Sequence, residues 1–195
     1  LDLKLQLWDH VQGLVYPNIR SMAYISDWRE THKESKTRGK CILVCTPLDA
    51  VDHLKVGYAV HCGEIRYPVS LNMLANWGCS VADVDRVAMD NLRQLHARTL
   101  EGMTEKSFKK REGIYEHSCS WRTDGYAASR ILLRAFPELN LQGEPVALVL
   151  NDNSVFITTQ NNSAATTRLR QMAQCTPAAG SSFLTTQLLH LKPSD

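Results

Sequence analysis

Short strand-forming runs and amphipathic helical segments follow one another in this chain without a regular strand–helix alternation. Runs rich in strand-forming residues cover 41–45, 55–62, 65–69, 145–150 and 155–159. A doubly wound parallel sheet would need a helix after almost every strand, whereas here several runs are separated only by turns. The pattern therefore predicts an α+β fold, with a mixed, mainly antiparallel sheet and about four helices packed on it.

Turn residues between these runs predict two hairpins. The first turn lies near Cys62-Gly63-Glu64, and the second is Asn151-Asp152-Asn153-Ser154. Asn, Asp, Ser and Gly favour turns because they tolerate left-handed backbone or hydrogen-bond their own main chain. A further strand is expected within 113–121.

The clearest helical pattern begins at Ser80, where Asp83 stands three positions on, close to a capping box. One stripe of this helix carries Val84, Val87, Ala88, Asn91, Leu92 and Leu95. An amide on a stripe that faces the core must find hydrogen-bond partners, or it costs roughly 1–3 kcal/mol. We therefore expect Asn91 to bind the backbone of a neighbouring loop.

Four other segments show helical spacing or helix boundary residues. The first two are 1–14 and 72–77, and Gly78 ends the second of these. The third is 126–136, which Asp124-Gly125 precedes. The fourth runs to about 174, with Ser163 as its N-cap. In the segment 126–136, Ala128 and Ile131 are expected to face inward, and Arg130 and Arg134 to line the other side.

Two segments have weaker patterns. The polar stretch 26–39 has almost no apolar periodicity, so it predicts a loop between two strands. The tail 183–191 is apolar and fits either a strand or a helix.

Chain size and composition predict a single α+β domain over residues 1–195. The sequence has 195 residues, 44% of them hydrophobic and 22% charged, which is enough apolar material for an ordinary core. No apolar run approaches the roughly 18–20 residues that cross a bilayer, and no signal peptide stands at the start, so we expect a cytoplasmic protein without a membrane partner. The net charge of +2 gives no reason to expect a nucleic-acid partner.

The spacing of the cysteines also favours a cytoplasmic location. They are too sparse for a disulfide scaffold, so reduced and mostly buried thiols are expected, although the even number leaves oxidised pairs as an alternative. The six are Cys41, Cys45, Cys62, Cys79, Cys119 and Cys175.

The segment Asp124-Gly125-Tyr126-Ala127-Ala128-Ser129-Arg130-Ile131-Leu132 resembles the YtpQ family, a group of bacterial cytosolic proteins without an established activity. The family pattern is Asp-Gly-Tyr, one free position, then Ala-Ser-Arg-Ile-Leu. Weaker similarities are Tyr16-Pro17-Asn18-Ile19-Arg20 and Asn91-Leu92-Arg93. Members carry an N-terminal extension and Leu1 is not a methionine, so the resemblance predicts that an N-terminal region is missing here.

The region from Asp124 to Arg130 is the best candidate for a binding site. This region is suited to binding an anion, because it combines a glycine, the free amides at the start of a helix and two polar side chains. The candidate ligand-binding residues are Arg20, Asn91, Asp124, Tyr126, Ser129 and Arg130. The structural alternative is that Asp124 caps the helix, Tyr126 packs in the core and Arg130 pairs with a carboxylate.

Metal, cofactor and nucleic-acid sites have weaker support. The metal-ligating residue types are Cys41, Cys45, His61, Cys62, His117 and Cys119, but no zinc knuckle or zinc-binding helix motif occurs. Phosphate-loop and dinucleotide fingerprints are also missing, so we expect neither a metal nor a cofactor. Acidic residues dilute both basic clusters, which makes nucleic acid an unfavoured partner.

Two functions stay open. The favoured hypothesis is a non-enzymatic module that binds a small anionic ligand or a protein partner. The alternative is a hydrolase or transferase that uses the Asp124 to Arg130 region, or His117 and Cys119, which share one face if their strand is regular.

Overall fold

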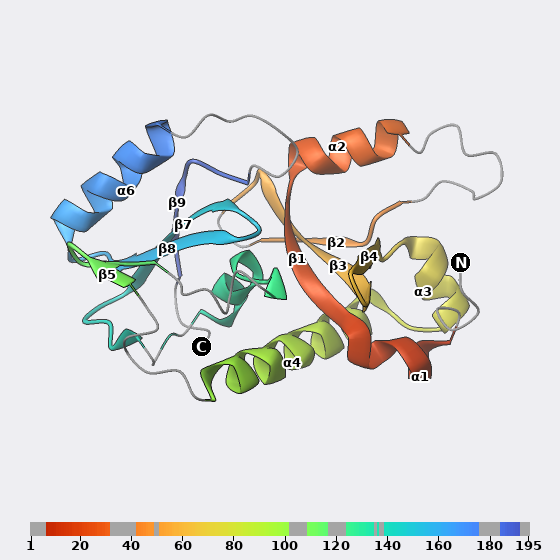
Figure 1. Cartoon of the computed structure of the whole chain (residues 1–195). Helices are drawn as coiled ribbons and strands as arrows, with labels where there is room; N and C mark the ends of the chain where they lie inside the picture. The colour runs from red at the N-terminus through yellow and green to blue at the C-terminus, as the bar shows by residue number, and fades with distance from the viewer. Residues whose placement is uncertain are drawn as a thin grey trace. The chain divides into compact units, whose positions relative to one another are not determined.

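The computed structural model describes residues 7–31, 42–48, 51–101, 109–116, 124–134, 136, 139–175 and 184–191. The chain divides into two compact units, Leu1–Leu95 and His96–Asp195, and the boundary falls within helix α4 (Val81–Leu100). The described residues of each unit include helices and an antiparallel sheet, which confirms the predicted α+β class (Figure 1). The prediction of a single domain stays a prediction.

The sheet of the first unit is antiparallel. Its strands are β1 (Val15–Ser21), β2 (Cys45–Pro47), β3 (Leu54–Cys62) and β4 (Ile65–Pro68). The order is β1-β3-β2, and β4 pairs with the later part of β3, so the hairpin predicted near Gly63 is confirmed. Pro17 lies in β1, at the end of this order, where a residue without an N–H is tolerated. The strand predicted at 41–45 is displaced: β2 begins at Cys45, and Leu43 forms an isolated bridge with Ser70.

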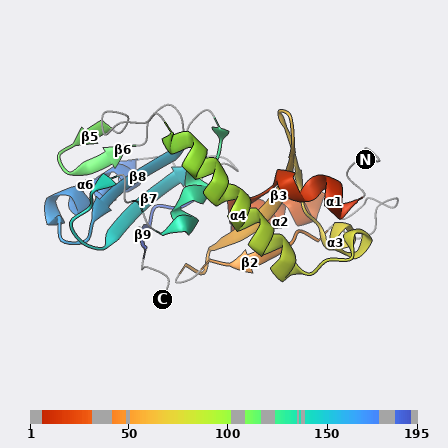
Figure 2. The same ribbon diagram turned by 90° about the horizontal axis from the view of Figure 1, so that it is seen from below.

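The two faces of this sheet differ in character. One face carries the fully buried side chains of Val15, Ile19, Leu54 and Val60. Figure 2 shows the first part of α4 crossing the sheet, and the hydroxyl of Tyr58 on β3 donates a 2.7 Å hydrogen bond to Asp85 Oδ1 of that helix. The apolar face is therefore covered by α4.

Helix α4 confirms both of its predicted polar contacts. Ser80 Oγ accepts from the Asp83 N–H at 3.2 Å, and Asp83 Oδ2 accepts from the Ser80 N–H at 3.0 Å, which is a capping box. Asn91 Nδ2 donates to the carbonyls of Gln12 and Val15 at 2.7 and 2.8 Å. The amide on the core stripe thus fixes the backbone that leads into β1, as the sequence predicts.

The capping box predicts how the stability of the fold depends on pH. Hydrogen bonds from the Ser80 side chain and N–H lower the pKa of Asp83 from its ordinary value of 3.8. A carboxyl whose pKa is lowered by folding stabilises the fold above its unfolded pKa, and this contribution is lost as the pH falls through the folded value. Replacing Asp83 with asparagine should therefore flatten the pH dependence of stability below about pH 4, where carboxyls titrate.

Chemical denaturation of parent and variant at several pH values checks this expectation. The exposed Asp90 of the same helix supplies a control, since Asp90→Asn leaves the capping box intact. Equal flattening in both variants would contradict the assignment of the effect to the cap.

The remaining helices of the first unit are short. Helix α1 (Trp8–Val11) continues as the 3-10 turn η2 (Gln12–Leu14), which confirms helical structure in the described part of 1–14. Helix α3 (Leu71–Trp77) ends as predicted at Gly78, whose φ of +66° is a left-handed conformation that glycine adopts without strain. The rings of Trp8 and Trp77 lie 5.4 Å apart between α1 and α3.

The loop predicted over 26–39 is wrong in its described part, because α2 covers Met22–Thr31. Only Ile25 is buried in this helix, so its apolar pattern is too sparse to be recognised. Its start is marked by Ser21, whose Oγ accepts from the Tyr24 N–H at 3.2 Å. Stacking of Tyr24 on Trp28, with ring centroids 6.5 Å apart, adds an i,i+4 contact. Residues 32–39 lie outside the described part.

The second unit contains a sheet in the order β5-β6-β8-β7-β9, also antiparallel. Its strands are β5 (Lys109–Arg111), β6 (Ile114–Glu116), β7 (Pro145–Asn151), β8 (Ser154–Thr159) and β9 (Leu188–His190). The hairpin β7–β8 is confirmed, and residues 188–190 of the ambiguous tail form the strand β9. Helix α6 (Ser163–Cys175) lies against this sheet (Figure 1), where Leu169 and Leu148 share one core.

The cap of α6 was predicted at the wrong residue. Asn162 precedes the helix and its Oδ1 accepts from the Ala165 N–H at 3.0 Å, whereas Ser163 is already the first helical residue. Asn and Ser are both common N-caps, and the sequence offers them side by side.

The helix predicted over 126–136 is confirmed only in part. The structure has a 3-10 helix, η4 (Ala128–Leu133), and Arg134 closes it with a φ of +58°. Both Ala128 and Ile131 are buried as expected, but Arg130, predicted on the outer side, is 0% exposed. The tighter 3-10 winding and the fixation of the Ala128 N–H by the Asp152 carbonyl, at 3.0 Å, place this arginine in the interior.

No helix in the described part of the chain has the length and apolar character needed to span a bilayer.

Candidate functional site

A pocket lies on the face of the first unit's sheet that is opposite to α4. Asn18 pairs with Gly57 across β1 and β3, and Gly57 pairs with Cys45 across β3 and β2. Residues paired across strands point to the same face. The cavity has a volume of about 190 Å³ and collects side chains from β1, β3, β2, β4 and α2.

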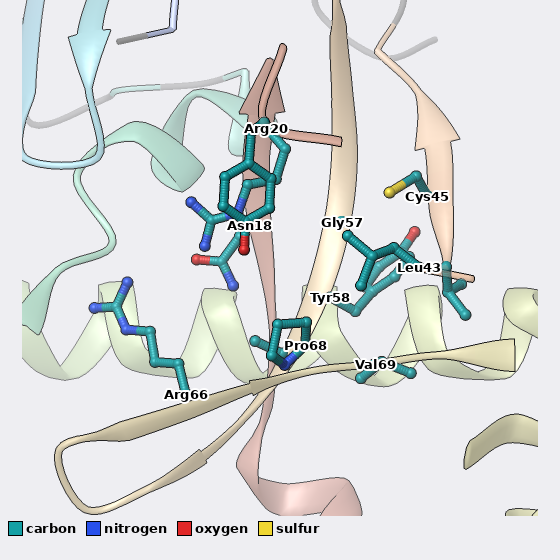
Figure 3. Close-up of a pocket in the computed structure, with 12 residues that line it drawn as sticks. Asn18, Arg20, Leu43, Cys45, Gly57, Tyr58, Arg66, Pro68 and Val69 are labelled. Atoms are coloured by element: carbon teal, nitrogen blue, oxygen red, sulfur yellow. The ribbon is translucent and has the colours of Figure 1, made fainter. Parts of the chain in front are cut away.

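One end of the pocket is cationic. Arg20 comes from β1, two positions after Asn18, and Arg66 comes from β4. Figure 3 shows both guanidinium groups and the Asn18 amide on the same side of Gly57. The described residues that line the pocket carry no carboxylate side chain. Two arginines that line one small cavity favour an anionic occupant.

Asn18 contributes an unused hydrogen-bond donor. Its side chain is 3% exposed, and within the part of the chain that the structure describes its Nδ2 has no hydrogen-bond partner. A buried donor without a partner costs roughly 1–3 kcal/mol, so such groups are rare unless a bound molecule satisfies them. Asn18 is one of the residues that line the cavity, so this buried donor belongs to the pocket wall.

The pKa of the Cys45 thiol is affected by the same positive charges. Burial raises the pKa of the Cys45 thiol, although the charges of Arg29, Arg20 and Lys55 act to lower it. The thiol therefore stays neutral and adds no negative charge to the pocket. Arg20 also lies over the ring of Tyr24, with Cζ 4.7 Å from the centroid, which holds its guanidinium by a cation–π contact.

The other end of the pocket is apolar. Leu43 and Cys45 line it, and Figure 3 places both on the side of Gly57 away from the two arginines. Glycine in the middle of a strand commonly marks a site where another molecule approaches the backbone. The pocket thus has a cationic end, a floor without a side chain and an apolar end.

The Asp124 to Arg130 segment, in the second unit, has a different geometry. Arg130 Nη1 and Nη2 donate to Asp124 Oδ1 and Oδ2 at 3.0 and 2.5 Å, and Nη2 also donates to Thr99 Oγ1 at 3.1 Å. Asp124 Oδ1 accepts from the Tyr126 N–H at 2.9 Å as well. Both carboxylate oxygens and the arginine fork are therefore engaged within the protein, as in the structural alternative.

The six candidate residues do not share the described pocket. Among them, only Arg20 lines it. Asn91 uses its amide hydrogens on two backbone carbonyls, while Tyr126 and Ser129 are 3% and 2% exposed beside the Asp124–Arg130 pair. Arg20 and Asn91 belong to the first unit and the other four to the second.

Metal-ligating side chains do not gather in the described part of the chain, where no group of three or more His, Cys, Asp or Glu residues is arranged to hold an ion. Cys45, Cys62, Cys79 and Cys175 are present as thiols. The pair His117 and Cys119 lies outside the described residues, as does Cys41.

Sequence reasoning missed Asn18, Gly57 and Arg66. Asn18 and Arg20 have the period-two spacing that puts polar side chains on one face of a strand, and this signal was available. Gly57 inside a strand-forming run was a second signal. Nothing local connects Arg66 with them, because only the pairing of β3 with both β1 and β4 brings the three together.

No family model, curated protein or solved structure matches this chain, so the resemblance to the YtpQ family stays a prediction.

Proposed function

We propose that this protein is a non-enzymatic module that binds a small anion in the pocket on the sheet of its first unit. The observation that carries the proposal is Asn18, which lines the cavity and whose buried Nδ2 has no hydrogen-bond partner among the described residues. Arg20 and Arg66 supply the charge, and their planar forks suit carboxylate or phosphate oxygens. The favoured occupant is therefore an anion that accepts hydrogen bonds at two or more oxygens.

The proposal keeps Arg20 from the sequence-based candidates and does not use Asp124 or Arg130. Their mutual ion pair accounts for the buried charge in the second unit without a ligand. In the first unit, by contrast, a donor is buried beside two cations, and an anion would satisfy it.

Thermal unfolding in the presence of simple anions tests this function. Sodium acetate, phosphate and sulfate are compared with sodium chloride at one ionic strength. At a free anion concentration of roughly five times Kd, binding contributes about 1 kcal/mol. In a chain of this size that gain raises Tm by about 2–4 °C. We expect the parent to show this rise with at least one of the three anions.

Matched variants separate binding from general salt effects. Arg66→Gln should lose the rise, whereas Arg86→Gln should keep it, because Arg86 is an exposed arginine of α4 in the same unit. Sulfate and phosphate also stabilise proteins by exclusion from their surface, and this contribution is equal in both variants. A rise of equal size in parent and Arg66→Gln would contradict the proposal, and so would the lack of any rise in the parent.

A second variant distinguishes a binding role of Asn18 from a structural one. Asn18→Leu removes the buried donor and keeps a similar volume. Without anion we expect the stability to be maintained or raised by about 1 kcal/mol, because the cost of the unsatisfied N–H disappears. The anion-dependent rise in Tm should be lost. A large loss of stability in this variant would assign Asn18 to the scaffold.

A further inference from the structure

The pocket has a shape that simple inorganic anions do not fill. Its cationic end lies over β1, where Asn18 and Arg20 stand, and its apolar end lies beside β2, where Cys45 stands. Neighbouring strands are roughly 4.8 Å apart, so two spacings from β1 across β3 to β2 give about 10 Å. A phosphate or sulfate ion bound at the arginines would leave the apolar end empty.

The volume agrees with a longer occupant. A dry cavity of about 150 Å³ holds a molecule of six carbons. The pocket here measures about 190 Å³, which leaves room for a carboxylate beside such a hydrocarbon part.

Gly57 provides the path between the two ends. A methyl group added there would lie 3.5 Å from Arg20 Cγ and 3.7 Å from Cys45 Sγ, both ordinary contact distances. The space above this glycine therefore connects the arginine side to the thiol side, and a hydrocarbon chain can pass over the bare backbone.

We infer that the ligand is a small organic acid, with its carboxylate among Asn18, Arg20 and Arg66 and an apolar tail that crosses Gly57 toward Leu43 and Cys45. This inference rests on the proposed function and adds the chemical class of the ligand. The carboxylate uses the donors, and the tail replaces water along the apolar end.

Isothermal titration of the parent with acetate, butyrate, hexanoate and inorganic phosphate tests the inference. Each buried methylene strengthens binding by about fourfold, so two or more buried methylenes make hexanoate at least about tenfold tighter than acetate. Arg66→Gln should weaken all three carboxylates. If the parent binds phosphate more tightly than hexanoate, and Arg66→Gln abolishes this phosphate binding, the inference is overturned while the proposed function stays in place. No binding of any of the four would overturn both.

Gly57→Ala gives a second, independent measurement. Its methyl group makes only ordinary contacts, so we expect a folded variant with the parent's Tm or a higher one. The methyl occupies the path of the tail, and the preference for hexanoate over acetate should fall by at least about fourfold, the value of one methylene. Gly13→Ala is the matched control, because an added methyl there meets nothing within 4 Å. An unchanged chain-length preference in Gly57→Ala would overturn the assigned path.

Discussion

Replacement of Asp124 by alanine is expected to lower the free energy of unfolding by about 3 kcal/mol or more. Arg130 is 0% exposed, and Asp124 accepts hydrogen bonds from both of its terminal nitrogens, so the variant takes this carboxylate away from a buried guanidinium. The Tyr126 N–H loses its acceptor at the same time. Urea denaturation of parent and variant measures the change.

The exposed pair of Asp90 and Arg93 is the matched control. Its oxygen–nitrogen distance of 2.7 Å is as short as in a buried pair, but the two side chains are 51% and 61% exposed. Exposed pairs contribute about 0–1 kcal/mol, so Asp90→Ala should cost little. An equal loss in Asp90→Ala and Asp124→Ala would contradict the buried ion pair.

A double variant distinguishes the pair from its separate residues. Arg130→Met also removes the buried charge, so the loss in Asp124→Ala combined with Arg130→Met should be smaller than the sum of the two single losses. Additive losses would show that Asp124 and Arg130 do not stabilise the second unit through each other.

Replacement of Asn91 by alanine is expected to cost about 2 kcal/mol of unfolding free energy, because the carbonyls of Gln12 and Val15 each lose a donor. Asn91→Asp should cost more. It is nearly isosteric with asparagine, but its ionised carboxylate places an acceptor against two other acceptors.

Thermal or urea unfolding of the Asn91 variants checks this prediction. Asn76→Ala supplies the control, since Asn76 is an exposed amide on a helix of the same unit. Similar losses in Asn91→Ala and Asn76→Ala would mean that the link from α4 to the start of β1 adds no stability.

Local signals in the sequence predicted several elements correctly. The capping box at Ser80, the glycine stop at Gly78 and the turn at 151–154 each depend on residues within four positions of one another. Such short-range hydrogen bonds and backbone preferences act in nearly any tertiary context. The partner type of Asn91 was also predictable, because a buried amide must be satisfied.

Two segments were predicted poorly, because their local patterns do not determine their structure. Helix α2 buries only Ile25, so its pattern resembles that of a polar loop. The segment 126–136 has helical spacing, but spacing near three to four residues does not separate a 3-10 helix from an α-helix. Hydrogen bonds to distant groups, such as that between Ala128 and Asp152, determined the outcome.

The sequence by itself determined the α+β class, the hairpins, the capping box at Ser80 and the presence of polar side chains that need partners. Only the tertiary structure decided which partners they have: Arg130 meets Asp124 in the interior, whereas Asn18, Arg20 and Arg66 gather over Gly57. The reason is physical. Caps and turns are formed by residues that adjoin in the chain, but a pocket is formed by the register of strands from distant segments, and that register depends on the packing of a whole sheet face.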